Sequence, residues 1–252
     1  MDITVIIPAR YYSTRFPGKP LAKLKGKTLI QHVYERTLQS KLTKKVVVAT
    51  DDKRILDEVK SFGGEAYMTS KDHLTGTDRI AELAREIDSS IIVNVQGDEP
   101  FIESDSIDIT IKPLLEENSL VMSTIKVKIE DIKEIFDFNV VKVVTDKDDF
   151  ALYFSRWPIP FLREKWCNIL NSEKNKDVLS HPTHLFKHLG LYAYKRDFLL
   201  QYTKWPRTPL EKIENLEQLR VLENGYKIKV VEGKYDSIGI DTPQDLERLE
   251  CS

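Results

Sequence analysis

The sequence predicts an α/β protein with a doubly wound, mainly parallel sheet, and three observations support this prediction. Apolar, β-branched runs recur through the first half of the chain, as buried strands require. Segments with a helical spacing of apolar side chains separate these runs. Gly, Pro and acidic residues mark the boundaries between the two kinds of segment. Strands that alternate with helices form βαβ units, whose strands lie parallel in one sheet.

The first half of the chain contains four predicted strands. Residues 3–9 form the first apolar run, and residues 45–50, 65–69 and 91–96 form the next three. Helices are predicted between them from an N-cap residue, Thr28, and from a Gly-Gly pair that ends the second helix. The predicted helices cover residues 28–40, residues 53–62, a segment that follows the loop 70–79 and reaches about residue 88, and residues 104–118.

The second half is less regular, and it contains a polar stretch at residues 164–183 that predicts a loop or flap. A long helix is predicted at 210–224, and the pattern Thr-Pro-Gln-Asp at 242–245 predicts the start of a last helix. The remaining apolar runs predict strands at residues 120–127, 140–144, 151–155, 186–194 and 227–232.

A cationic loop follows the first predicted strand. It carries Arg10, Arg15 and Lys19, with the hydroxyls of Ser13 and Thr14 between them and a Pro-Gly turn before Lys19. A buried strand that ends in such a loop, with a helix to follow, suits a polyphosphate. A solvated basic turn is the alternative, because further lysines follow and neither common nucleotide fingerprint, G-x-x-x-x-G-K-[ST] or G-x-G-x-x-G, is present.

A second loop, Gln-Gly-Asp-Glu-Pro at 96–100, follows the fourth predicted strand. In the common doubly wound order the first strand lies beside the fourth, and ligands bind in the crevice at that switch point. We therefore expect Asp98 to face the cationic loop and to hold a divalent metal shared with phosphate oxygens, since Mg²⁺ needs only one or two carboxylates. Asp241, at the end of a late apolar run, is a candidate second ligand. The alternative is that Asp98 caps the following helix.

Composition excludes several classes of protein. The chain has 252 residues, 41% of them hydrophobic, which suffices for one large domain or for one domain with a lobe. A formal net charge of −2 argues against nucleic-acid binding. No apolar run reaches the ~18–20 residues that span a membrane. Two isolated cysteines, Cys167 and Cys251, form no disulfide framework and favour a reducing, cytoplasmic location.

Among the smaller candidates, Arg156 and His188 suit an anionic substrate, although each is equally at home in an ion pair. His181 and His184 lie close together, but without a cysteine pair nearby they favour surface residues over zinc ligands. Lys19 lacks the K-x-D-G setting of a covalent nucleotidyl lysine, so we interpret it as a phosphate-binding residue.

Taken together, these segments resemble the 3-deoxy-D-manno-octulosonate (Kdo) cytidylyltransferases. The opening IIPARYYSTRFPGKPL at residues 6–21 looks like the signature of that family, and the similarity covers nearly the whole chain. The other matching segments are VATD at 48–51, HLTGTDR at 73–79, VNVQGDEP at 93–100, ALYFSR at 151–156, HLGLY at 188–192, LEQLR at 216–220 and GIDTP at 239–243.

The resemblance implies a Rossmann-like three-layer α/β/α nucleotide-diphospho-sugar transferase fold, with a mixed, mainly parallel sheet and a dimerisation arm in the second half. It also implies that CTP and Kdo give CMP-Kdo and pyrophosphate for lipopolysaccharide synthesis, with Mg²⁺ as cofactor and a cytoplasmic homodimer as the active form. The first 120 residues would then mainly bind the nucleotide. Residues 121–252 would mainly bind the sugar and form the dimer. No nucleic acid or membrane partner is expected.

The resemblance also assigns residue roles. Catalytic residues are Arg10, Arg15, Lys19 and Asp98, and the metal ligands are Asp98 and Asp241. Nucleotide contacts come from Arg10, Ser13, Thr14, Arg15, Lys19, Thr75, Gly76, Arg79, Gln96 and Gly97. The sugar-acid pocket is formed by Gln96, Arg156, His188, Glu211 and Gln218, of which Arg156 is the best type of cation for a carboxylate. The alternatives are activation of another acidic sugar, of the 8-amino-Kdo or sialic-acid type, or a non-catalytic nucleotide-sensing module.

Overall fold

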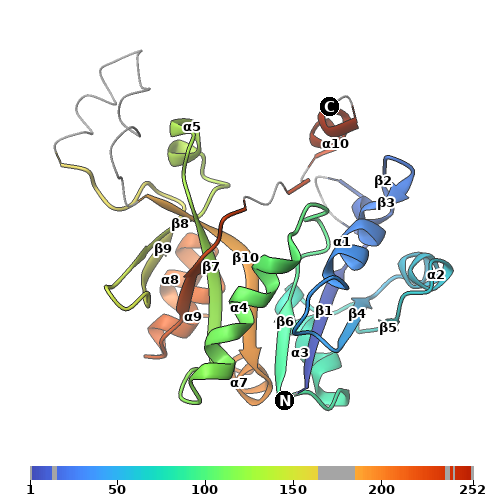
Figure 1. Cartoon of the computed structure of the whole chain (residues 1–252), viewed down its shortest axis with the longest axis horizontal. Coiled ribbons are helices and arrows are strands. Elements are labelled where there is room, and N and C mark those ends of the chain that lie inside the picture. The colour runs from blue at the N-terminus through green and yellow to red at the C-terminus, as the bar shows by residue number, and fades with distance from the viewer. Residues whose placement is uncertain (1, 13–15, 164–184, 236–238, 241, 251–252) are drawn as a thin grey trace. The chain divides into compact units, whose positions relative to one another are not determined.

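The computed structural model of the chain describes residues 2–12, 16–163, 185–235, 239–240 and 242–250. The chain forms two compact units (Figure 1). The first unit contains Met1–Ser123, Gly190–Trp205 and Tyr235–Ser252, and the second contains Thr124–Leu189 and Pro206–Lys234. The first boundary lies close to the predicted division at residue 120, but two later segments return to the first unit. The predicted flap at 164–183 lies outside the described residues.

The sheet of the first unit has β1 (Ile3–Ala9) at its centre. β1 pairs in parallel with β4 (Lys45–Thr50) on one side and with β6 (Ile91–Asn94) on the other. β5 (Ala66–Met68) continues the parallel sheet beyond β4. The prediction that the first strand lies beside the fourth is therefore confirmed. The strand order reverses at β1, and open α/β sheets bind ligands at such a switch point.

The apolar run that predicted β1 is buried on both faces. Val5, Ile6 and Ile7 are 0% exposed, so helices cover the sheet on either side, as a parallel sheet requires. The helices of the first unit lie on the two faces, with α1 (Leu29–Thr37) in contact with α4 (Ser104–Glu116), and α3 (Gly76–Glu86) in contact with α7 (Arg196–Tyr202). The unit also contains α2 (Lys53–Ser61) and α10 (Pro243–Glu250).

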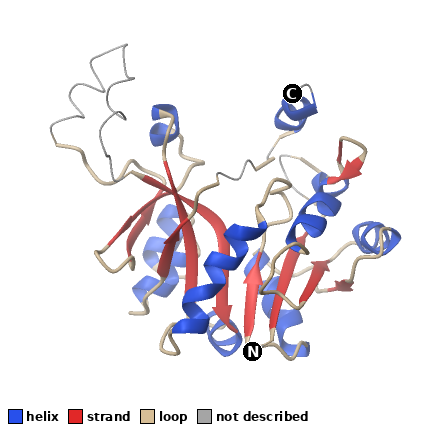
Figure 2. Cartoon of the chain, in the orientation of Figure 1, coloured by secondary structure: helices blue, strands red, loops and turns tan. Residues whose placement is uncertain are grey.

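One antiparallel strand makes the sheet mixed, as the resemblance implied. β10 (Phe186–Lys195) runs from the second unit into the first, where its residues Tyr192–Lys195 pair antiparallel with β6. β7 (Met122–Lys128) likewise begins in the first unit and ends in the second. Figure 2 shows the strands with helices on both sides.

The second unit is built on short antiparallel strands. β8 (Lys142–Thr145) pairs with β9 (Ala151–Ser155) and with the start of β10, and β11 (Lys229–Glu232) completes the set. Its helices are α5 (Ile132–Phe136), α8 (Pro209–Glu214) and α9 (Gln218–Glu223). The prediction of one helix over 210–224 was wrong, because Asn215 adopts a left-handed conformation with φ of 52° and ends α8.

Two features near the cationic loop have no strong sequence signal. A short turn of 3-10 helix, η1 (Lys19–Leu21), begins at Lys19, and a hairpin of β2 (Lys23–Leu24) and β3 (Lys27–Thr28) follows. The hydroxyl of Thr28 donates to Glu58 of α2 instead of capping its own helix, although Thr28 holds the predicted N-cap position.

In the part of the chain that is described, no helix is long and apolar enough to span a membrane.

Candidate functional site

Three predicted nucleotide-binding segments converge on Pro8 at the carboxyl end of β1. Gly97, in the loop after β6, lies so close that a Cβ there would be 3.0 Å from the carbonyl oxygen of Pro8. Gly76, the first residue of α3, would place a Cβ 3.2 Å from the ring of Pro8. Arg10 follows β1 directly and its side chain is exposed. Glycine at these two positions thus lets the loop after β6 and the start of α3 approach the strand that leads into the cationic loop.

The two loops at the switch point are joined by an ion pair. Lys19 Nζ donates to Asp98 Oδ2 at 2.6 Å, and the two side chains are 12% and 35% exposed. The expectation that Asp98 faces the cationic loop therefore agrees with the geometry. A helix-capping role does not, since Glu103 holds the N-cap position of α4.

The C-terminal segment reaches the same place. The backbone N–H of Ile240 donates to the carbonyl of Asp98 at 3.0 Å, and the fully buried Ile240 packs with Leu24 and Leu29. The chain just before residue 241 is thereby fixed beside Asp98. Asp241 itself lies outside the described residues, as do Ser13, Thr14 and Arg15.

Arg79 is buried, 3% exposed, and its guanidinium is bonded to protein groups. It donates to Asp51 Oδ2 at 2.8 Å, to the hydroxyl of Thr69 at 2.5 Å and to the carbonyl of Ser70 at 3.2 Å. These contacts join the ends of β4 and β5 to α3. Arg79 was predicted to approach the nucleotide; its contacts instead hold the loop that leads to Gly76. No role was predicted for Asp51. Its position directly after an apolar strand is the sequence feature that could have indicated one.

Thr75 and Gln96 are the remaining predicted nucleotide contacts. The Thr75 hydroxyl accepts from the backbone N–H of Asp78 and donates to its carboxylate, so it caps α3 beside Gly76. Gln96 is half-buried, and its amide donates to Asn94 Oδ1 at 3.0 Å and to the carbonyl of Gly190 at 3.5 Å. The side-chain amide of Gln96 is thereby oriented by the neighbouring strand β10.

In the second unit, Arg156 binds backbone carbonyls. Its guanidinium donates to the carbonyls of Glu214 at 2.8 Å and Phe138 at 2.9 Å, and its own backbone N–H donates to the Glu214 carboxylate. The neighbouring Lys142 donates to the carbonyls of Asp137 and Val140, and burial lowers its pKa to about 8. Two cations therefore hold the turn before β8.

His188 is uncharged at neutral pH. Burial lowers the pKa of His188 to about 3, its Nε2 lies 2.9 Å from the hydroxyl of Thr124, and its ring meets the edge of Phe154 with centroids 5.0 Å apart. A neutral imidazole exchanges hydrogen bonds with hydroxyl groups and carries no charge for a carboxylate. The surroundings of His188 therefore fit a sugar hydroxyl better than an anion.

Glu211 and Gln218 differ sharply in their surroundings. Glu211 is 0% exposed and accepts two hydrogen bonds from Arg220, at 2.8 and 2.6 Å. Burial favours the neutral acid, but the bonds from Arg220 hold the pKa of Glu211 below its usual value. Gln218 is 3% exposed, and its Nε2 has no hydrogen-bond partner among the described residues. Glu211 was predicted as a sugar contact; its bonds are those of a structural acid, while Gln218 keeps a free donor.

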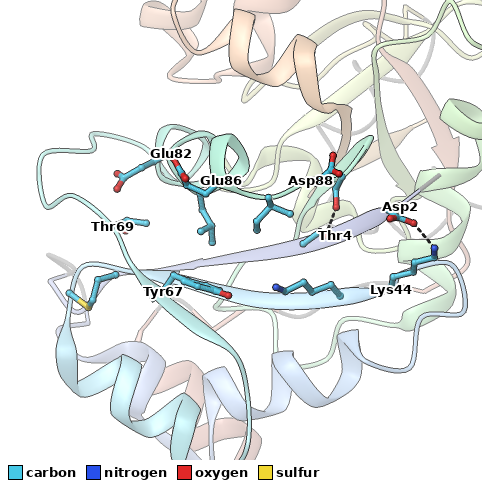
Figure 3. Close-up of a pocket in the computed structure, with 13 residues that line it drawn as sticks. Asp2, Thr4, Lys44, Tyr67, Thr69, Glu82, Glu86 and Asp88 are labelled. Atoms are coloured by element: carbon cyan, nitrogen blue, oxygen red, sulfur yellow. Dashed lines mark hydrogen bonds and ion pairs between the residues drawn. The ribbon is translucent and has the colours of Figure 1, made fainter.

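A cavity of about 600 Å³ lies elsewhere in the first unit, between α3 and the strands β1, β4 and β5 (Figure 3). It is lined by Asp2 and Thr4 at the start of β1, by Lys44 and Lys45 at the start of β4, and by acids of α3 that include Glu82 and Glu86. These are mainly the amino ends of the strands, whereas Arg10, Lys19 and Asp98 follow carboxyl ends. The cavity is therefore separate from the predicted crevice.

Comparisons with known proteins identify similar sequences along nearly the whole chain. Residues 4–228 match the family described as Cytidylyltransferase. The chain is 56% identical over 249 residues to the 3-deoxy-manno-octulosonate cytidylyltransferase of Geotalea daltonii, covering 99% of this chain and 97% of that protein. It is 55% identical to that of Geobacter sulfurreducens, covering 99% and 98%.

Solved structures of similar fold are also cytidylyltransferases. A CMP:2-keto-3-deoxy-manno-octonic acid synthetase complexed with CTP superposes with a TM-score of 0.88 and 39% identity, covering all of this chain and 98% of that one. A cytidylyltransferase from Leptospira borgpetersenii, at 19% identity and a TM-score of 0.62 over 99% and 85% of the two chains, shares the fold.

Proposed function

The chain belongs to the cytidylyltransferase family, and from this premise we propose that it joins CTP to Kdo, giving CMP-Kdo and pyrophosphate. The observation that carries the proposal is an identity of 52–57% over nearly the whole chain to relatives named for this activity. The superposition on a synthetase complexed with CTP supports the same substrate. We further propose that the product serves lipopolysaccharide synthesis in the cytoplasm.

In the proposed reaction the anomeric hydroxyl of the sugar acid attacks the α-phosphorus of CTP. A new P–O bond forms and the hydroxyl releases its proton to solvent, while the bond from the α-phosphorus to the oxygen bridging the β-phosphate breaks and pyrophosphate leaves with the bonding electron pair. Such transfers depend on positioning and on the stabilisation of negative charge. Arg10 and Lys19, at the two ends of the cationic loop, are the described residues that we assign to the triphosphate, and Arg15 is proposed with them.

Magnesium is the proposed cofactor, and the residues present suit it. Asp98 offers carboxylate oxygens at the switch point, and its Oδ2 already accepts a hydrogen bond from the ammonium of Lys19, so a cation fits there. Among the described residues no cluster of three or more metal-binding side chains occurs, but Mg²⁺ usually takes one or two carboxylates together with phosphates and water. Bound Mg²⁺ would act as a Lewis acid on the phosphates. We propose Asp98 and Asp241 as its ligands.

For the sugar we propose contacts from Gln218 and His188 of the second unit, and Gln96 of the first unit is proposed as a nucleotide contact. The free Nε2 donor of Gln218 and the neutral ring of His188 suit the hydroxyls of Kdo. Arg156 remains the proposed partner of the sugar carboxylate, although its Nε, NH1 and NH2 atoms all donate to carbonyls. Glu211 is proposed only as support for this region, through Arg220.

We also propose that the chain acts as a homodimer through its second unit. That unit exposes several large apolar side chains, and exposed apolar patches mark interaction surfaces in soluble proteins. They are Phe138 (58% exposed), Leu152 (62%), Trp157 (65%) and Phe161 (74%). The rings of Phe138 and Trp157 stack on each other. Sedimentation of the purified protein tests this proposal, and substitution of Trp157 with Glu is expected to give a monomer.

The activity itself is tested by pyrophosphate release from CTP and MgCl₂ with Kdo, 8-amino-Kdo or sialic acid as the acceptor. We expect release with Kdo and little without an acceptor. Release with a different acid only would replace Kdo by that acid. Calorimetric CTP binding without any turnover would instead indicate a nucleotide-sensing module.

A further inference from the structure

A stacked pair of side chains supports the cationic loop from outside. The guanidinium carbon of Arg54, in the first turn of α2, lies 3.3 Å from the ring centroid of Tyr11. That distance places the guanidinium directly over the aromatic face, a favourable cation–π arrangement. Tyr11 directly follows Arg10, so the contact joins the start of the cationic loop to the helix after β4.

Arg54 is itself held in position by Asp52. Its Nε and NH2 donate to the two carboxylate oxygens of Asp52 at 2.9 and 2.7 Å. The Asp52 carboxylate also accepts from the backbone N–H of Arg54 at 2.9 Å and so caps α2. The backbone N–H of Asp52 in turn donates to Thr50, the last residue of β4. The guanidinium plane is therefore fixed relative to the sheet, which a lone exposed arginine would not be.

Tyr11 closes the loop at its other end. Its carbonyl accepts a hydrogen bond from Gly18 at 2.8 Å, and a Cβ on Gly18 would lie 3.2 Å from the Tyr11 ring. Gly18 has a φ of 73° and directly precedes Lys19. Tyr11 is thus bonded to Gly18 through its backbone and has its ring beside Gly18, so the position of Tyr11 is coupled to the segment that carries Lys19.

From these contacts we infer that Arg54 is a positioning residue for the cationic loop: supported by Asp52, it holds Tyr11 and thereby sets the placement of Arg10 and Lys19 for the triphosphate. The inference rests on the proposed function, because the ligand of the loop is taken to be CTP. Arg54 itself is 51% exposed, and its charge is balanced by Asp52, so its contribution is geometric.

The test compares CTP binding, measured by calorimetry without sugar acid, across five variants. Arg54→Met removes the planar cation, Tyr11→Leu removes the ring, and Tyr11→Phe keeps the ring. Arg54→Met and Tyr11→Leu are expected to weaken CTP binding about two- to fivefold, the factor that corresponds to about 0.5–1 kcal/mol for a partly exposed cation–π contact. The double variant Arg54→Met/Tyr11→Leu is expected to lose no more than either single variant, since both remove one contact. Tyr11→Phe is expected to bind CTP like the wild type.

Lys53→Met is the matched control. Lys53 precedes Arg54, is exposed, and its loss changes the net charge equally. An equal loss of CTP affinity in Lys53→Met and Arg54→Met would indicate a general charge effect and overturn the inference, as would wild-type affinity in Arg54→Met. In turnover assays Arg54→Met is expected to raise KM for CTP while KM for the sugar acid stays unchanged. The thermal midpoint is expected to move by less than about 4 °C.

Failure of the proposed function would be recognised separately. If the wild type binds CTP but releases no pyrophosphate with any sugar acid, the proposed reaction is wrong and the binding series still decides the role of Arg54. Inorganic tripolyphosphate, titrated in parallel, probes the loop without a base. A wild-type protein that binds neither CTP nor tripolyphosphate would overturn both statements.

Discussion

The ion pair between Lys19 and Asp98 leads us to predict that removing the lysine strengthens metal binding to the protein alone. Without nucleotide, the ammonium of Lys19 bonds to the same carboxylate that we assign to Mg²⁺. A metal ion that binds to the protein alone must therefore displace Lys19 or share the carboxylate of Asp98 with it. Lys19→Met removes the ammonium but keeps a similar chain length, so Asp98 becomes available. We expect this loss of a cation to strengthen metal binding.

The magnitude follows from the burial of the pair. Two unit charges about 4 Å apart attract by about 4 kcal/mol at an effective dielectric constant of about 20, but measured exposed pairs yield a net of about 0.2–1 kcal/mol. Lys19 is 12% and Asp98 35% exposed, which places the pair at the upper end of that range. A gain of about 1 kcal/mol corresponds to a dissociation constant about fivefold lower.

The assay is an electron paramagnetic resonance titration of Mn²⁺, in place of Mg²⁺, without nucleotide. With CTP present the same variant is expected to lose activity, because a charge-assisted contact to the triphosphate contributes about 1.5–3 kcal/mol. Lys19→Arg, which keeps the charge, serves as the control and is expected to bind Mn²⁺ like the wild type. Unchanged or weaker Mn²⁺ binding by Lys19→Met would refute the competition between lysine and metal.

Four further outcomes are expected. Asp98→Asn and Asp241→Asn are expected to be strongly non-additive in kcat measured against Mg²⁺ concentration, because both ligands serve one ion; additive losses would contradict the shared site. Arg156→Lys is expected to raise KM for the sugar far more than KM for CTP, and equal effects would make Arg156 structural. Gln218→Met is expected to leave the thermal midpoint unchanged and to raise KM for the sugar, whereas an unchanged KM would remove Gln218 from the pocket. The lowered pKa of His188 means that its ring binds a proton more weakly in the folded state, so the free energy of unfolding falls as pH drops from 6.5 towards about 3. The variant His188→Gln is expected to show a shallower fall with pH in urea titrations. An identical fall would contradict the neutral state of the ring.

The first half of the fold followed from hydrophobic patterning, because β1, β4 and β6 are buried on both faces and the helices end at clear signals. The apolar run at 45–50 and the helix that ends before Gly63 match β4 and α2 closely. The prediction of one helix over 210–224 failed because its apolar spacing continues through Asn215, whose left-handed conformation has no strong signal in the sequence. Propensity could not distinguish one helix from two short ones.

At the candidate site, sequence reasoning placed Asp98 opposite the cationic loop because strand order alone determines that neighbourhood. It did not indicate that Arg79 pairs with Asp51, or that Glu211 pairs with Arg220. A charged residue in a motif looks the same whether it binds a ligand or a neighbouring side chain. Only the geometry of the partner, which lies far away in sequence or on another element, separates the two.

The first unit is built from three stretches of the chain that are separated in sequence, and this affects how the unit folds during synthesis. The ribosome releases Met1–Ser123 first, but this stretch leaves one side of β6 without the strand β10 that pairs with it in the finished protein. Ile240, which packs on Leu24 and bonds to Asp98, is synthesised after the whole of the second unit. A truncated nascent chain would therefore expose an unpaired strand edge, which is prone to aggregation. The neighbourhood of Asp98 is therefore complete only after Ile240 has been synthesised.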